Sequence, residues 1–295
     1  MSRATFRGCA SAIVTPFRAD LSLDEDALRR VISRQIDGGM DFVVPCGTTG
    51  ESPTLTHAEH LRVCEIAVEE CRGKVPVLAG CGGYDTAAIC TLAKELEALG
   101  VDGLLSVTPY YNRPTQEGLY RHYVAIAEST SLPIVLYSVQ KRTGVNIEPA
   151  TVLRLAQVSN IVAIKEASGD IGQIATILNQ VPDDFLVLSG DDAITLPLLA
   201  LGGHGLISVA GNEAPGPIAE MVHLALAGDW ERARSLHRRW FDLMNVNFVE
   251  SSPGPVKAAL GMMGVCEPVA RLPIVMPRPE TEARIREVLT QVGLI

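Results

Sequence analysis

Positive charge is scarce in this chain. Only five of the 295 residues are lysines, the formal net charge at pH 7 is −9, and no long run of like charges occurs. Surfaces that bind nucleic acids or anionic membranes need clustered Lys and Arg. We therefore expect no nucleic acid and no membrane among the partners, and an anionic substrate has to be held by a few local cations.

Long apolar segments and paired cysteines are also missing. No segment approaches the length of a transmembrane helix, which needs about 20 apolar residues. Arg3 and Arg7 precede a short apolar run at residues 9–14, but the longer apolar core and cleavage pattern of a signal peptide are absent. The seven cysteines form no C-x-x-C pair and are odd in number, which argues against a disulfide framework or a zinc ribbon. We therefore expect a protein of the reducing cytoplasm.

What the sequence does contain is a repeated alternation of short apolar runs and helical patterns. Apolar residues recur at helical spacing before Gly38-Gly39 and before Gly100, and residues 56–59 (THAE) have the form of a capping box. Eight strand–helix units predict an α/β fold with a parallel sheet, and eight strands close into a TIM (β/α)8 barrel. An open doubly wound sheet is the alternative, although no G-x-G-x-x-G follows the first strand. The predicted strands lie at residues 12–14, 42–44, 75–79, 103–107, 134–137, 161–164, 185–188 and 205–209.

The chain continues well beyond the eighth predicted strand. Residues 215–295 are enough for about three more helices. We therefore predict a barrel that carries the active site over residues 1–214, and a C-terminal helical region, residues 215–295, that packs on the barrel.

Lys165 is the most informative single residue. It ends the apolar run at residues 161–164, and a strand that is apolar on both faces belongs to a covered parallel sheet. Burial at the end of such a strand lowers the pKa of an ammonium group. The resulting neutral amine attacks ketones and aldehydes, and its imine turns an α-keto acid into a carbon nucleophile. A lysine that extends to solvent or pairs with Glu166 is the structural alternative.

Other polar residues follow other predicted strands, where a TIM barrel builds its active site. Residues 47–51 (GTTGE) place two hydroxyls between two glycines, and such a turn can hold a carboxylate. Tyr137 can relay a proton, and Arg142 can bind a carboxylate through two parallel hydrogen bonds. Taken singly, the turn is only moderately specific and could simply be a tight turn, and packing at the rim and a solvated loop charge are the better explanations of Tyr137 and Arg142. Together they predict a site that joins a keto acid to another carbonyl compound.

Five segments resemble the dihydrodipicolinate synthase family of the pyruvate-dependent class I aldolases, in the right order over nearly the whole chain. The resemblance implies a TIM barrel with a C-terminal helical region, assembled as a homotetramer (a dimer of dimers), without a cofactor. It also implies condensation of pyruvate with L-aspartate 4-semialdehyde to 4-hydroxy-tetrahydrodipicolinate, in lysine and diaminopimelate biosynthesis. The segments are residues 47–51 (GTTGE), 108–112 (TPYYN), Tyr137 with 142–144 (RTG), 164–170 (IKEASGD) and 188–192 (LSGDD).

The resemblance further implies roles for individual residues. Lys165 is expected to form the Schiff base, and Tyr137 to act as the general acid and base. Thr49 and Tyr111 complete the proton relay, with Tyr111 reaching into the site of a neighbouring subunit. The implied substrate-binding residues are Thr48, Thr49, Gly190 and the Ile207 carbonyl for pyruvate, and Arg142 for the carboxylate of the semialdehyde.

The regulatory site that binds lysine in this family is only partly kept. Tyr84 and Ala88 stand where many lysine-inhibited members have Asn and Glu, so we expect weak feedback inhibition by lysine or none. The retained positions are Ser52, His57, His60 and Tyr110.

Three alternative functions remain open from the sequence. Ser138 and Gln140 replace the Asn and Pro that are usual in the loop that positions Arg142. The second substrate could therefore differ, as in a sister aldolase such as an N-acetylneuraminate lyase or a keto-deoxy-sugar-acid aldolase. A metal-dependent aldolase needs His and carboxylate ligands, but His57 and His60 have no obvious third partner, and we expect no metal. A non-catalytic keto-acid-binding protein has no need of an imine-forming lysine.

Overall fold

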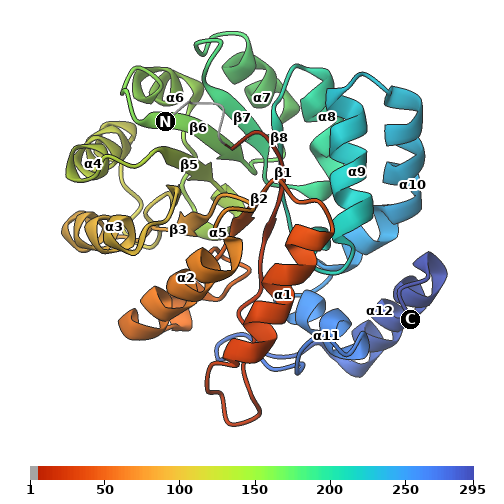
Figure 1. The fold of residues 1–295 in the computed structure, drawn as a ribbon. Helices are drawn as coiled ribbons and strands as arrows, with labels where there is room; N and C mark the ends of the chain where they lie inside the picture. Colours follow the sequence, from red (N-terminus) through yellow and green to blue (C-terminus); the bar gives the residue numbers. More distant parts are fainter. Residues whose placement is uncertain (1–5) are drawn as a thin grey trace.

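Eight parallel strands at the centre of the molecule confirm the predicted barrel. The computed structural model describes residues 6–295, so Arg3 lies outside the described residues. The strands are β1 (Gly8–Ala12), β2 (Phe42–Val44), β3 (Leu78–Gly80), β4 (Gly103–Val107), β5 (Ile134–Ser138), β6 (Ile161–Glu166), β7 (Leu186–Ser189) and β8 (Gly205–Ser208) (Figure 1).

The strands follow one another around a nearly closed barrel. Their order is β2-β1-β8-β7-β6-β5-β4-β3, and every ladder is parallel. A single parallel bridge between Val43 and Val77 joins β2 to β3, with a bond from the Val43 N–H to the Pro76 carbonyl at 3.0 Å. The carboxyl ends of all eight strands therefore face the same side of the molecule.

Helices surround the strands, and their ends follow the chemistry expected from the sequence (Figure 1). The helix before Gly38 ends there, and Gly100 ends another in the left-handed conformation. The capping box is present, since Thr56 and Glu59 each accept a hydrogen bond from the other's backbone N–H. The helices up to β8 are α1 (Glu25–Asp37), α2 (His57–Cys71), α3 (Thr86–Leu99), α4 (Gln116–Ser129), α5 (Gln140–Thr143), α6 (Pro149–Leu155), α7 (Ile171–Leu178) and α8 (Thr195–Ala200), with short 3-10 turns η2 (Ser52–Thr54) and η3 (Asp192–Ile194).

Two apolar layers hold the barrel together. The larger layer lies between the strands and the helices and includes Leu28, Ile66 and Ile164. The smaller layer includes Phe42 and Leu188 and is made mainly of strand residues. Because successive side chains of a strand point to opposite faces, these residues point away from the helices and fill the barrel interior. A filled interior leaves the carboxyl ends of the strands as the place for a site.

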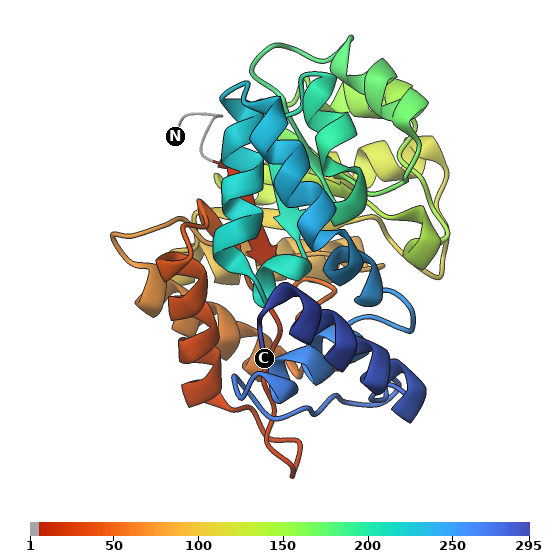
Figure 2. The ribbon, with the colours of Figure 1, turned by 90° about the vertical axis from the view of Figure 1, so that its right-hand side faces the viewer.

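The C-terminal part contains four helices rather than about three. They are α9 (Pro215–Leu226), α10 (Trp230–Val246), α11 (Gly254–Met262) and α12 (Pro279–Val292), preceded by η4 (Ala210–Asn212). α9 packs on β1 and α1 and so completes the ring of helices. Figure 2 shows α11, in medium blue, and α12, in dark blue, beside the barrel rather than within that ring. The division of the chain at residue 214 stays a prediction, because α9 belongs to the barrel by its packing.

The first and third strands differ from their predicted positions. β1 ends at Ala12, the first residue of the predicted run at residues 12–14, because Val14 gives its N–H to the side chain of Asn212 instead of a strand. β3 begins at Leu78, after Pro76, since proline has no N–H for a ladder. Among residues 6–295, no helix is long and apolar enough to cross a membrane.

Candidate active site

Lys165 lies at the carboxyl end of β6, inside the barrel mouth. Its side chain is only 4% exposed, so it does not extend to solvent. Neighbouring strand residues point to opposite faces, and the adjacent Glu166 accepts hydrogen bonds from Ser168 and Gln173 instead. The two structural alternatives for Lys165 are therefore wrong.

The surroundings of Lys165 favour a neutral amine. The pKa of Lys165 is lowered to about 7, mainly by burial and also by the positive charge of Arg142, although the carboxylate of Asp192 acts in the opposite direction. A substantial share of the amine is consequently unprotonated near neutral pH, as a nucleophile requires.

Tyr137 stands beside Lys165 on the neighbouring strand. The two residues are register partners in the β5–β6 ladder, and the Lys165 Nζ lies 4.4 Å from the centre of the Tyr137 ring. Burial raises the pKa of Tyr137, although Arg142 and a hydrogen bond with Thr48 act in the other direction. The phenol is thus protonated at neutral pH and able to donate a proton beside the amine.

The turn at residues 47–51 follows β2 and is closed by its own backbone. The N–H groups of Gly50 and Glu51 donate to the carbonyls of Gly47 and Thr48 at 3.1 Å each, and the Thr15 hydroxyl donates to Gly50 at 2.7 Å. The N–H groups of Thr48 and Thr49 make no hydrogen bond to another described residue. They and the Thr49 hydroxyl remain available for an anion, whereas the Thr48 hydroxyl is hydrogen-bonded to Tyr137.

Arg142 reaches the site from α5, the short helix after β5. Its Nη2 donates to the carbonyl of Ser252 at 3.2 Å, which ties α5 to the C-terminal part. The side chain is exposed at the barrel mouth, and its charge acts on both Tyr137 and Lys165. This is the position of a cation that can meet an incoming carboxylate.

Gly190 and Asp192 follow β7 and support Lys165. A Cβ on Gly190 would lie 2.7 Å from the Ala167 Cβ and 3.0 Å from the Lys165 Cε, so only glycine leaves room for the lysine stem. Asp192 is buried and accepts a hydrogen bond from the Val209 N–H at 3.0 Å and another from Ser208. Asp192 was not singled out from the sequence, although its place directly after a strand was a usable signal. Ile207 lies on β8 and belongs to the barrel interior.

Tyr111 does not join the other site residues within one chain. Its side chain is 91% exposed and its backbone is in the left-handed region, with φ of 69°, which a bulky residue rarely adopts. Its neighbour Tyr110 packs edge-to-face on Tyr84, with ring centres 5.3 Å apart. The loop thus presents Tyr111 outward.

The predicted regulatory residues are only partly brought together. Ser52 and His60 line a small cavity of about 30 Å³ together with Thr48 and Tyr137. His57 is exposed and pairs with Glu95 at 3.1 Å. The two histidines therefore do not form a ligand pair.

His60 has two sulfur neighbours that the sequence did not reveal. Donor atoms of Cys46, His60 and Cys64 all lie within 4.8 Å of one another. Cys46 follows β2 and Cys64 belongs to α2. The two cysteines are too far apart in the sequence to match a short metal-binding motif. Only the packing of α2 on the strand end brings them together.

A buried ion pair supports the turn from the C-terminal part. Lys257 on α11 and Glu51 form an ion pair in which both side chains are at most 1% exposed. The Lys257 Nζ also donates to the Val269 carbonyl at 2.8 Å, and the Arg271 N–H donates to Glu51 at 2.9 Å. Lys257 is one of the five lysines, and its position within an apolar helix was a signal that sequence reasoning did not use.

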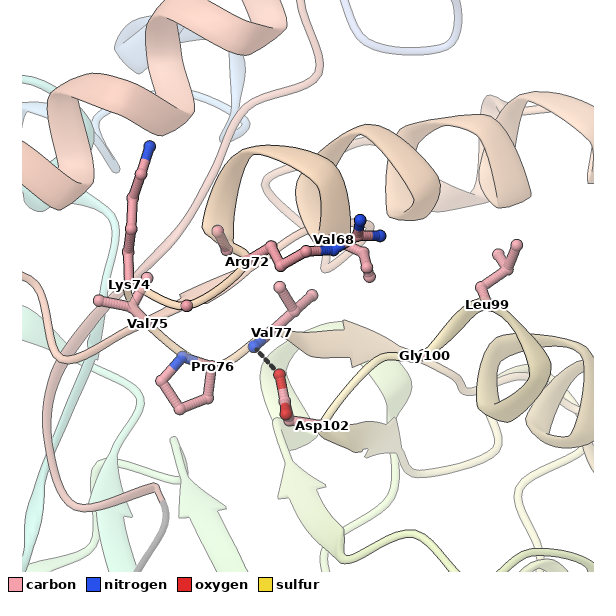
Figure 3. Close-up of a pocket in the computed structure, with 11 residues that line it drawn as sticks. Val68, Arg72, Lys74, Val75, Pro76, Val77, Leu99, Gly100 and Asp102 are labelled. Atoms are coloured by element: carbon pink, nitrogen blue, oxygen red, sulfur yellow. Dashed lines mark hydrogen bonds between the residues drawn. The ribbon is translucent and has the colours of Figure 1, made fainter.

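A larger pocket lies away from these residues. It has a volume of about 480 Å³. Figure 3 shows a hydrogen bond between two of its lining residues, which the Val77 N–H donates to Asp102 at 2.8 Å. Both residues precede their strands, β3 and β4, so this pocket is at the amino ends, opposite Lys165. Active sites of TIM barrels lie at the carboxyl ends of the strands, which is the opposite end of this barrel.

The comparisons with known proteins agree with this arrangement. The Dihydrodipicolinate synthetase family matches residues 5–292. A 4-hydroxy-tetrahydrodipicolinate synthase of Koribacter versatilis is 53% identical over 290 residues, which cover 98% of this chain and 97% of that protein. The crystal structure of dihydrodipicolinate synthase from Aquifex aeolicus is 44% identical, with a TM-score of 0.96, and the match covers 98% of this chain and 99% of that one.

A second similar structure is described as a monomeric dihydrodipicolinate synthase variant. It is 43% identical, has a TM-score of 0.97 and covers 99% of both chains. The predicted enzyme class, an aldolase-type lyase with 4-hydroxy-tetrahydrodipicolinate synthase activity, is confirmed by these relatives, and neither a sister aldolase nor a binding protein is favoured. The chain belongs to the dihydrodipicolinate synthetase family.

Proposed function

We propose that Lys165 forms the Schiff base with pyruvate and that Tyr137 moves the protons of the reaction. The observation that supports this assignment most strongly is the buried amine of Lys165 beside the Tyr137 phenol, 4.4 Å from the ring centre. A pKa of about 7 for that amine suits it to attack a ketone at neutral pH.

The proposed reaction follows from the chemistry of the imine. The Lys165 Nζ attacks C2 of pyruvate, and loss of water gives a protonated imine. A proton leaves C3 to form an enamine, whose C3 attacks the aldehyde carbon of L-aspartate 4-semialdehyde, and the resulting alkoxide takes up a proton. The amino group of the semialdehyde then attacks C2, closes the ring and releases Lys165, which yields 4-hydroxy-tetrahydrodipicolinate.

The substrates are proposed to bind through the groups around Lys165. The pyruvate carboxylate lies on the Thr49 hydroxyl and on the N–H groups of Thr48 and Thr49, which make no backbone hydrogen bond to another described residue. Gly190 and the Ile207 carbonyl line the pocket, and Arg142 binds the carboxylate of the semialdehyde. The hydroxyl that is hydrogen-bonded to Tyr137 is that of Thr48, so we place Thr48, rather than the expected Thr49, between Tyr137 and Tyr111 in the proton relay.

The proposed relay requires a second subunit. Tyr111 is 91% exposed, so it can enter the site of a neighbouring copy in a homotetramer made of two dimers. Because one similar structure is a monomeric variant, the assembly needs its own test.

Mixing two inactive variants tests the shared site. Lys165→Met and Tyr111→Phe each disable every site of a homo-oligomer. In a mixed dimer, one site combines an intact Lys165 with an intact Tyr111 from the partner, so mixing after partial dissociation is expected to restore turnover of pyruvate and aspartate semialdehyde. Full activity of Tyr111→Phe alone, or no recovery in verified mixed dimers, would contradict the shared site.

We also propose that lysine inhibits this enzyme weakly or not at all. Tyr84 fills the space beside Tyr110 with its ring, and Ala88 offers no carboxylate to an amino group. Turnover measured across a lysine titration tests this directly, and the double variant with Tyr84→Asn and Ala88→Glu is expected to be more sensitive than the natural enzyme. Strong inhibition of the natural enzyme would contradict the proposal.

A further inference from the structure

We propose that Cys46, His60 and Cys64 form a binding site for a thiophilic divalent cation such as Zn²⁺. The donor atoms of these three residues lie within 4.8 Å of one another. Because no two of these atoms are more than 4.8 Å apart, an ion at the centre of the triangle lies within about 2.8 Å of all three. That distance exceeds the usual Zn–S distance of about 2.3 Å by only about half an ångström. Small side-chain movements therefore suffice to bind an ion.

The two sulfurs already have a suitable spacing. The Cys64 Sγ is hydrogen-bonded to the Cys46 Sγ at 3.8 Å. Two thiolates that bind one tetrahedral zinc at about 2.3 Å lie about 3.8 Å apart. An ion that displaces both thiol protons, the one Cys64 donates to Cys46 and the one Cys46 donates to the His60 carbonyl at 3.7 Å, can thus bind both sulfurs without a change in their separation.

The carbonyl of Gly80 orients the third ligand, His60. The His60 Nε2 is hydrogen-bonded to the Gly80 carbonyl at 2.9 Å. Because a carbonyl only accepts, Nε2 carries the proton, and the lone pair is on Nδ1. This is the outer contact that orients metal-binding histidines in proteins.

The backbone of Cys46 is fixed by the end of β3, and its thiol donates to the His60 carbonyl at 3.7 Å. A Cβ on Gly80 would lie 2.0 Å from the Cys46 carbonyl oxygen, so the end of β3 is pressed against Cys46. Cys46 also has a positive φ of 54°, a conformation that non-glycine residues hold only when their surroundings impose it. The thiol is therefore held in place before an ion arrives.

A fourth ligand has room beside the cluster. Cys46 and His60 both line the cavity of about 30 Å³ that also reaches Thr48 and Tyr137. A cavity of that size holds one or two water molecules, so a water can complete a tetrahedral site. The cavity also connects the cluster to the active site, from which an ion can enter.

Binding of Co²⁺ to the metal-free, fully reduced enzyme tests the site, with a spectrum as its readout. We expect one equivalent of Co²⁺ to produce the visible bands of tetrahedral cobalt and a near-ultraviolet thiolate-to-cobalt band, both displaced by Zn²⁺. Cys64→Ala is expected to lose the bands. Cys90→Ser is the matched control, because Cys90 is a cysteine of the next helix that bonds to the Ala125 carbonyl.

The readout separates this inference from the proposed reaction, since it does not depend on turnover. Retained turnover shows that Cys64→Ala is folded, and His60→Gln, which keeps both thiols, is expected to alter the visible bands. The proposal is overturned if the natural protein shows no cobalt bands while all seven of its cysteines titrate as free thiols. Bands that Cys64→Ala retains in full also overturn it.

Discussion

Lys165 and Tyr137 are register partners on adjacent parallel strands, with the amine 4.4 Å from the centre of the phenol ring. The barrel places both side chains at its mouth because both strands end there. The desolvation that makes the amine nucleophilic also keeps the phenol protonated. One environment therefore prepares a nucleophile and a proton donor side by side.

Removing the phenol tests its role in proton transfer. We expect Tyr137→Phe to lower kcat by about 10²–10⁴-fold, the usual effect of losing a general acid or base, while Lys165 still forms a trapped adduct with pyruvate. Tyr123→Phe is the matched control, since this buried phenol donates to the Ser106 carbonyl at 3.2 Å, away from Lys165. Equal activities of Tyr137→Phe and the natural enzyme would exclude the role.

The reactivity of Lys165 is expected to depend on pH. Only the neutral amine attacks pyruvate, so the rate of imine trapping by cyanoborohydride should rise with pH and level off above a midpoint of about 7. Because the charge of Arg142 lowers the pKa of Lys165, Arg142→Met should move the midpoint to higher pH. Arg121→Met, which removes an exposed charge that pairs with Glu117, should leave it in place. A midpoint that Arg142→Met lowers would contradict the account.

The space beside Lys165 allows a steric test. The Cβ of Gly190→Ala would contact the Lys165 stem and Ala167, and overpacking of this kind costs about 1–3 kcal/mol. We expect a lower melting temperature and a large loss of imine formation, because the amine is displaced. Gly216→Ala is the control, since its Cβ would meet only the Gly38 carbonyl, at 3.9 Å. An active Gly190→Ala enzyme would mean that the pocket tolerates a displaced lysine.

The buried ion pair between Glu51 and Lys257 is expected to stabilise the turn that holds pyruvate. Lys257→Met leaves the Glu51 carboxylate buried, with the Arg271 N–H as its remaining hydrogen-bond partner among residues 6–295, and breaking such a pair costs about 3–5 kcal/mol. We expect a lower free energy of unfolding and a higher KM for pyruvate.

Removing the unpaired charge of Glu51 provides the control for Lys257→Met. The double variant with Glu51→Gln and Lys257→Met should recover part of the lost stability in chemical denaturation. Arg232→Met, which removes an exposed partner of Glu220, should change neither stability nor KM. A Lys257→Met enzyme with unchanged stability and KM would show that the pair does not support the turn.

The sequence predicted those features that depend on local pattern. Strand ends are local, so the sequence alone places Lys165, Tyr137 and residues 47–51 at the barrel mouth. The first strand was misplaced because Val14 bonds to Asn212, a partner 198 residues away in the chain.

Contacts between distant segments were not predictable in the same way. The Arg271 contact with Glu51 spans 220 residues, and the approach of Cys64 to Cys46 depends on how α2 packs against the end of β2. No periodicity or motif encodes either contact. The outward direction of Tyr111 likewise follows from its left-handed backbone conformation. Because aromatic residues rarely adopt this conformation, nothing in the sequence predicted it.

Borohydride trapping with pyruvate tests the central claim most directly. The natural enzyme is incubated with pyruvate, reduced with sodium borohydride and analysed by intact mass and peptide mapping, with Lys165→Met treated in parallel. We expect one reduced pyruvyl adduct per chain, on Lys165, and none on the variant. An unmodified Lys165, or an adduct on any of the other four lysines instead, would contradict the account.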